Sequence, residues 1–185
     1  MNILKWLLLI TFLTTVLAGC SEDTATSNPD KVFKINGVFG IQLGDQGRGL
    51  PDGYINDNKA FDFTPNATYK DFSAYTFSVT PNTHIIYGIK MTSPKELPTA
   101  SCKEQRDEMI KQTLATLGDT SNLKVSGNGI QWKIREDNQR SIIIDCELTL
   151  TPTTRQLVMI YSDSVLSKLS YVEWAKHQDD ITKPQ

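Results

Sequence analysis

Residues 130–150 carry the pattern that most restricts the fold, because two runs of alternating apolar and polar side chains flank one short polar segment. Alternation with a period of two predicts β-strands with one buried face. The segment Asp137-Asn138-Gln139 has three residues, and an odd-numbered loop lets Trp132 and Ile144 share that face. The apolar positions of the two runs are Ile130, Trp132 and Ile134, then Ile142, Ile144, Cys146, Leu148 and Leu150.

The N-terminus has the layout of a secretory signal, with Lys5 followed by an apolar run over residues 6–16. This run is shorter than the ~20 residues of a membrane-spanning helix. It ends in Leu17-Ala18-Gly19-Cys20, which resembles the lipobox of bacterial lipoproteins. The resemblance implies that residues 1–19 are removed and that Cys20 carries acyl chains, which anchor the chain in a membrane. Ser21 follows, where inner-membrane members of the family tend to have Asp, so we expect an outer-membrane protein that faces the periplasm.

The rest of the chain divides into a tether and one domain. Residues 20–31 are rich in Ser, Thr, Asp and Pro and predict a flexible tether, and residues 32–185 predict a single domain. Removal of Lys5 with the signal leaves 18 basic against 21 acidic residues, a net charge of −3. This mild acidity, without clustered Lys and Arg, argues against a nucleic-acid partner.

Cys102 and Cys146 are the cysteines left once Cys20 is lipidated, and an exported chain folds where thiols are oxidised. We therefore expect a disulfide between them. Ser101 and Glu104 fit a capping box at the start of a helix that ends at Gly118. The disulfide would then fix a helix to the sheet. The apolar stripe of this helix is Met109, Ile110, Leu114 and Leu117.

The first half predicts another hairpin, from residues 74–79 to residues 85–91, with further strands at 38–43 and 60–63. Its turn Thr80-Pro81-Asn82-Thr83 resembles Thr151-Pro152-Thr153-Thr154, and a second helix is expected over residues 162–177. Either the chain contains two ββα-type repeats or T-P-x-T is ordinary turn chemistry that occurs twice. Both interpretations predict an α+β fold, a two-layer antiparallel sheet with two helices on one face. The apolar side of the second helix is Val165, Leu166, Leu169, Val172 and Ala175.

Sequence motifs for catalysis or for cofactor binding are not found. The glycine-rich residues 44–53 lack the pattern of a phosphate-binding loop, and His84 and His177 fall into no G-x-S-x-G or H-E-x-x-H context. Two cysteines without C-x-x-C spacing do not suggest a metal site. We therefore expect no enzyme activity, no cofactor and no metal.

A binding face follows from the repeat alignment, which predicts that Val158 and Ile160 point to the helices. Leu157 and Met159 would then lie on the opposite face, in an apolar strip bordered by charges. A β-bulge that shifts the strand, or coverage by the N-terminal segment, is the alternative. The residues of the expected binding face are Ile86, Lys133, Arg135, Ile143, Leu157 and Met159.

Two functions fit these expectations. The first is a protein-binding module of the cell envelope, of the inhibitor, immunity or adaptor type. The second is a structural accessory lipoprotein of an envelope assembly complex. Both require a protein partner and a lipid anchor at Cys20.

Overall fold

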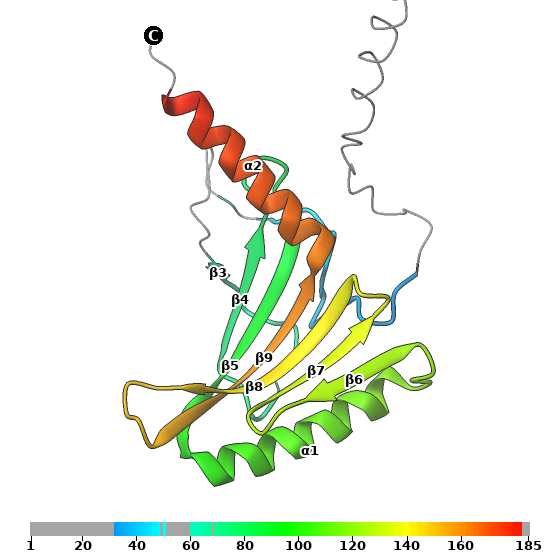
Figure 1. The fold of residues 1–185 in the computed structure, drawn as a ribbon, viewed down its shortest axis with the longest axis vertical. Helices are drawn as coiled ribbons and strands as arrows, with labels where there is room; N and C mark the ends of the chain where they lie inside the picture. The colour runs from blue at the N-terminus through cyan, green and yellow to red at the C-terminus, as the bar shows by residue number, and fades with distance from the viewer. Residues whose placement is uncertain (1–31, 49, 51–59, 68, 183–185) are drawn as a thin grey trace, which may run out of the picture.

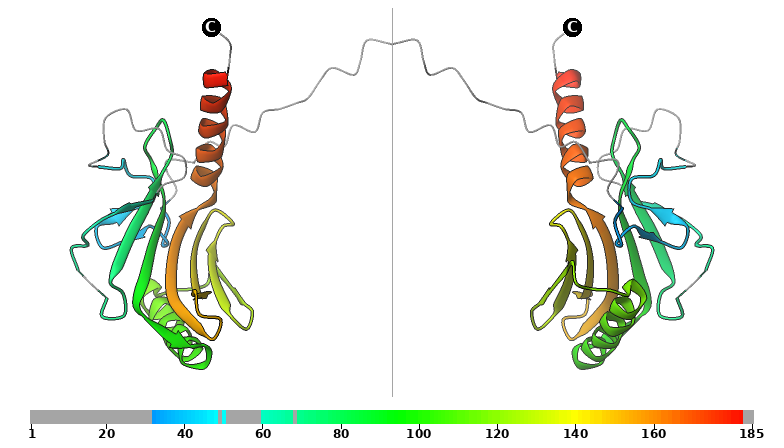
Figure 2. Two further views of the ribbon diagram at one scale, coloured as in Figure 1. Left: turned by 90° about the vertical axis from the view of Figure 1, so that its left-hand side faces the viewer. Right: turned by 90° about the vertical axis from the view of Figure 1, so that its right-hand side faces the viewer.

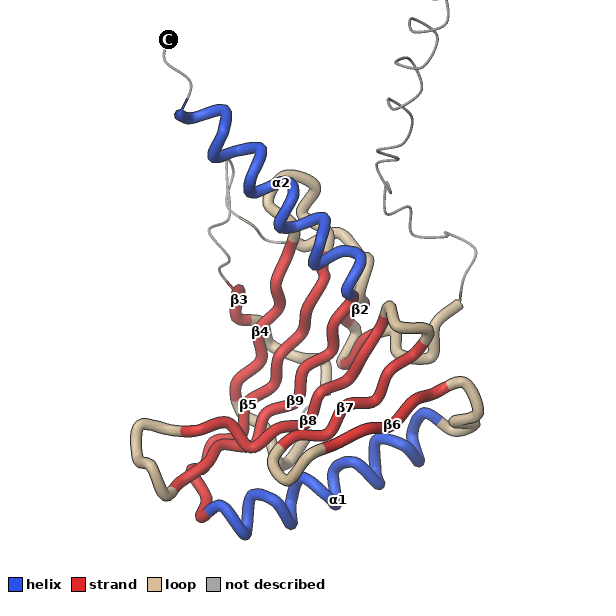
Figure 3. The backbone as a smooth tube through the Cα atoms, viewed as in Figure 1, coloured by secondary structure: helices blue, strands red, loops and turns tan. Residues whose placement is uncertain are grey.

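The computed structural model describes residues 32–48, 50, 60–67 and 69–182. Its core element is a seven-stranded antiparallel sheet in the order β3-β4-β5-β9-β8-β7-β6, shown in Figures 1 and 3. A separate small hairpin pairs β1 with β2. The predicted α+β fold, an antiparallel sheet with two helices, is confirmed. The strands are β1 Gly37–Val38, β2 Ile41–Gln42, β3 Ala60–Asp62, β4 Ala74–Val79, β5 Ile86–Pro98, β6 Leu123–Gly127, β7 Gln131–Glu136, β8 Arg140–Leu148 and β9 Thr154–Asp163, and the helices are α1 Thr99–Leu117 and α2 Ser164–Thr182.

The β7–β8 hairpin has the predicted register. Trp132 lies opposite Ile144 and Ile134 opposite Ile142, across the three-residue loop. Asp137 and Asn138 take φ angles of 48° and 58°, the left-handed conformation that such loops use. Leu148 and Leu150 were expected to be buried, but they are 60% and 103% exposed. The reason is that the β8–β9 hairpin projects beyond the rest of the sheet, at the lower left of Figure 1.

Helix α1 is fixed to the sheet by the predicted disulfide between Cys102 and Cys146, both buried. Closing this loop contributes about 4 kcal/mol on the chain-entropy model. The helix ends before Gly118, as predicted, but it begins at Thr99 with Pro98 at the N-cap position and no side-chain cap. The Ser101 cap was therefore wrong. The chain passes directly from β5 into α1, because the β5–β9 pairing continues to Pro98.

The two helices do not form one covering layer, and here the arrangement differs from the expectation of two helices on one face. They lie at opposite ends of the sheet (Figure 1). Residues 32–48, which we call the N-terminal segment, lie on one side of β4 and β5 in Figure 2, and α2 lies on the other. Helix α2 is held by Glu173, whose carboxylate accepts hydrogen bonds from the amides of Asn82 and Thr83 at 2.7 and 3.2 Å. Val172, expected on the apolar side, is 61% exposed. Neither helix is long and apolar enough to span a membrane, for the residues that the structure describes.

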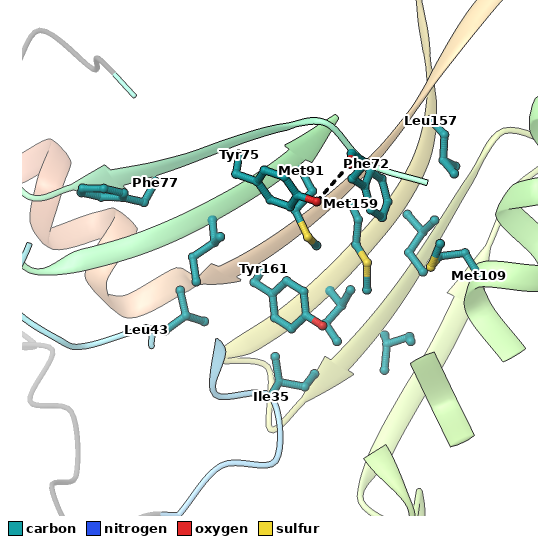
Figure 4. Close-up of a cluster of buried hydrophobic side chains, with 14 of the residues drawn as sticks. Ile35, Leu43, Phe72, Tyr75, Phe77, Met91, Met109, Leu157, Met159 and Tyr161 are labelled. Atoms are coloured by element: carbon teal, nitrogen blue, oxygen red, sulfur yellow. Dashed lines mark hydrogen bonds between the residues drawn. The ribbon is translucent and has the colours of Figure 1, made fainter. Parts of the chain in front are cut away.

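The hydrophobic core lies between the sheet, α1 and the N-terminal segment that precedes β3, and Figure 4 shows part of it. Tyr75 donates a hydrogen bond to the carbonyl of Phe72 at 3.0 Å. Burial raises the pKa of Tyr161, with a smaller contribution from Tyr69, so this phenol is neutral at physiological pH. The side chains that are less than 2% exposed include Ile35, Ile89, Met91, Ile134, Ile142, Ile144, Leu157 and Met159.

Residues 38–43 form two short strands rather than one. Phe39 and Gly40 make the turn between β1 and β2, with φ angles of 56° and 82°. Left-handed backbone is unfavourable for a phenylalanine. The Phe39 ring packs edge-on against Tyr69 and Tyr75, at 5.1 and 5.6 Å between ring centroids, and these contacts offset the strain.

Candidate functional site

The sheet has a second face, opposite the core, which we call the outward face. Cys146 pairs with Leu157 and Ile144 with Met159, and these four side chains point into the core. Successive side chains of a strand alternate between faces. Ile143, Asp145 and Glu147 of β8 and Val158 and Ile160 of β9 therefore lie on the outward face.

Three of the six residues predicted for a binding face do lie together on the outward face. Lys133 pairs with Ile143 across β7 and β8, and Arg135 pairs with Ser141. Ile86, Leu157 and Met159 were placed wrongly, because all three are buried in the core cluster with exposures of 4%, 0% and 1%.

A β-bulge accounts for the misplacement. The β4–β5 ladder shifts register between Ser78 and Val79, so that β5 holds one extra residue. Both halves of the chain run from a hairpin into a helix, but the register of the β8–β9 pairs is continuous. The repeat alignment matched the two hairpins residue by residue without this extra residue. It therefore assigned the residues of β9 to the wrong faces of the sheet. Val158 and Ile160, predicted to point to the helices, consequently point outward.

Acidic groups on the outward face already have partners. Lys90 reaches across β9 to Glu147, with Nζ 2.8 and 2.9 Å from the carboxylate oxygens. By register this ion pair crosses β9 at the level of Val158, which is fully buried although it faces outward. Gln131 donates to Oδ2 of Asp145 at 3.0 Å. Glu147 is thus neutralised within the chain, whereas Asp145 has one hydrogen-bonded oxygen and no ion pair with another described residue.

Basic side chains gather on the neighbouring strands β6 and β7. Lys124 lies directly opposite Arg135, and Lys133 follows one position further along the same face. We call these three residues the basic strip. None of them forms an ion pair or side-chain hydrogen bond with another described residue. Like charges placed directly opposite on a sheet repel, so the basic strip costs stability in the free chain.

Lys124 was not predicted as a site residue, because β6 itself was missed. The alternation Leu123-Lys124-Val125-Ser126 could have indicated a strand, but it is short and follows the helix end at Gly118 closely. Four alternating residues are too few to assign a strand from the sequence pattern alone.

Two polar atoms of the outward face lack hydrogen-bond partners. Nε of Arg135 and Oδ1 of Asp145 are shielded from solvent and unbonded within the described residues. Buried polar groups usually have partners, so each such atom is a weak point of the isolated domain.

A separate cleft of the described part of the chain lies elsewhere, beside the β1–β2 hairpin, with a volume of about 510 Å³. Phe39, Phe63 and Phe77 form its apolar walls. Asp45 and Arg48 also line it, and both residues are exposed. The size suits a small molecule, but ligand sites generally combine such walls with converging polar groups.

The histidines lie on separate elements. His84 is in the turn between β4 and β5, and His177 is on α2. Over residues 32–182, with the gaps stated above, no three His, Cys, Asp or Glu side chains are placed to share a metal ion. We therefore take the outward face of β6 to β8 as the candidate site.

Comparison with known proteins gives no relative. No protein-family model matches the chain, and neither the curated proteins nor the solved structures contain a significant match.

The assignment of faces predicts opposite outcomes for two similar substitutions. Met159→Lys places a charge in the core, and we expect it to cost several kcal/mol or to prevent folding. Ile143→Lys places the same side chain on the outward face, where Ile143 is partly exposed and lies opposite Lys133, and should cost only about 1–2 kcal/mol. Urea unfolding followed by circular dichroism measures both. Equal losses of stability would contradict the assignment.

Proposed function

We propose that this chain is a lipid-anchored protein of the bacterial outer membrane that faces the periplasm and binds a partner protein through the outward face of β6, β7 and β8. The observation that carries the proposal is the basic strip of Lys124, Lys133 and Arg135, three cations on one face, none of which forms an ion pair with a described residue. A partner that supplies carboxylates would remove the repulsion between them and would make the face complementary.

Ile143 supports the same surface. It lies on β8, directly opposite Lys133 of β7, and remains partly exposed. Interfaces commonly combine a small apolar centre with a charged rim. The strands that carry these side chains are held in place by the ladder of β6 to β9, so the surface is preorganised and little ordering free energy is spent on binding.

The anchor belongs to the proposal as well. Cys20 and the whole of residues 1–31 lie outside the described residues. The lipobox-like Leu17-Ala18-Gly19-Cys20 supports lipidation at Cys20. A tether of residues 20–31 would hold the domain near the membrane surface, where its partner would also be found.

Loss of the anchor is the first expected outcome. Cys20→Ser should leave an unprocessed precursor that incorporates no labelled fatty acid, since the thiol is the acyl acceptor. Cys102→Ser with Cys146→Ser is the matched control and should still be acylated. Normal acylation of the Cys20→Ser chain would show that the anchor assignment is wrong.

Loss of partner binding is the second expected outcome of the proposal. Lys133→Glu with Arg135→Glu reverses two charges of the basic strip, and we expect at least about a tenfold loss of affinity for the partner while the fold is retained. Lys168→Glu with Lys176→Glu makes the same change at exposed positions of α2 and should leave binding intact. Quantitative co-purification of the partner from detergent-solubilised membranes measures the loss.

The two types of partner give different results in this experiment. A structural accessory should co-purify with its complex from resting membranes, whereas an inhibitor or immunity protein should capture its target only when the target is supplied. Equal binding by both double variants would rule out the outward face as the docking surface.

A further inference from the structure

The strand β6 forms one edge of the seven-stranded sheet (Figure 1). Four of its five residues, from Lys124 to Gly127, are exposed. In an antiparallel pair, alternate residues exchange hydrogen bonds with the neighbouring strand and the others point their backbone groups away from it. The strand therefore has a row of backbone donors and acceptors that β7 does not use.

The direction of the free groups follows from the bonds at both ends of β6. The amide of Leu123 donates to the carbonyl of Thr120, and the amide of Asn128 donates to the carbonyl of Gln131, both at 2.9 Å. Lys124 and Ser126 are thereby the residues that exchange bonds with β7. The backbone groups of Val125 and Gly127 point outward, and within the described part of the chain no strand lies beyond β6 to pair with them.

Side chains around this edge indicate what would pair with it. On the outward face the edge is bordered by Lys124, Arg135 and Lys133, the basic strip. On the opposite face Val125 is 42% exposed. A strand added to β6 would thus meet cations on one side and an apolar residue on the other.

We infer that β6 receives an extended segment of the partner protein in which acidic and apolar residues alternate, added to the sheet as an eighth strand. Main-chain hydrogen bonds to Val125 and Gly127 supply the pairing, and the basic strip selects the acidic side chains. This inference rests on the proposed function and specifies the partner's chemistry.

An edge strand with lysine can also serve to prevent unwanted pairing. Protection of the edge requires a charge on β6 itself, whereas here Lys124 is also opposed by Arg135 and followed by Lys133 on β7, at a cost in repulsion. A second copy of the chain is a further occupant of the edge. Antiparallel pairing of two β6 strands would place two basic strips side by side on the same face, where like charges oppose the dimer.

The experiment uses the full chain in detergent and a short capped peptide of alternating Glu and Val. We expect the peptide to bind and to slow hydrogen exchange at the amides of Val125 and Gly127. A peptide of alternating Lys and Val should not bind, because it repeats the charge of the basic strip. A Glu–Val peptide N-methylated on alternate amides should not bind either, because it lacks the main-chain donors.

Val125→Pro is the decisive variant. The amide of Val125 faces outward, so proline removes the edge donor without removing a β6–β7 hydrogen bond. Affinity for the Glu–Val peptide should fall at least about tenfold with the melting temperature little changed. Val125→Thr keeps the amide and the branched shape and should bind as the unsubstituted chain does. Lys124→Glu should also weaken binding, and it decides the matter if Val125→Pro does not fold.

Each contrary outcome is distinct. Absence of peptide binding, or equal affinity of Val125→Pro, overturns the inference. Concentration-dependent protection of β6 without peptide identifies a second copy as the occupant and overturns it too. If the peptide fails while Lys133→Glu with Arg135→Glu still abolishes capture of the partner, the proposed function is retained and only the edge-strand site is wrong.

Discussion

The buried ion pair between Arg140 and Asp163 is the interaction on which the rest of the structure depends. Nε of Arg140 lies 3.1 Å from Oδ2 of Asp163, and the two side chains are 10% and 1% exposed. The guanidinium also donates to the carbonyls of Ile35 and Leu43 and stacks 4.3 Å from the centre of the Phe33 ring. Three parts of the chain, the N-terminal segment, the β7–β8 turn and the end of β9, therefore meet at one arginine.

Further hydrogen bonds extend from this ion pair to its neighbours. Oδ1 of Asp163 accepts hydrogen bonds from the amides of Val165 and Leu166, which caps the first turn of α2. Glu136, which pairs with Arg140 across the turn, accepts from the amides of Lys34 and Ile35 at 3.1 and 2.8 Å. The N-terminal segment is thus held over the core face. The outward face of β6 to β8 is left to the basic strip.

The features that the sequence predicted correctly are those set by residues close together in the chain, together with the disulfide. The odd loop at 137–139, the strand faces of β7 and the first part of β8, the end of α1 at Gly118 and the pairing of Cys102 with Cys146 all followed from local patterns and the cysteine count. The bulge in the first hairpin did not, because Ile85, Tyr87, Ile89 and Met91 alternate in the sequence as if no residue were extra. Three of the six binding-face residues were misplaced for this reason. The Arg140 cluster joins residues about 100 positions apart, and no local pattern indicates such a contact.

A double-mutant cycle on Arg140 and Asp163 tests the central role of this pair most directly. Arg140→Met removes the charge and retains much of the side-chain volume, whereas Asp163→Asn retains an acceptor for the α2 cap. Urea unfolding of the two single variants and the double variant gives the coupling free energy. We predict a coupling of about 2 kcal/mol or more, because each single variant leaves an unpaired buried charge. Additive effects, with a coupling below about 0.5 kcal/mol, would contradict the account.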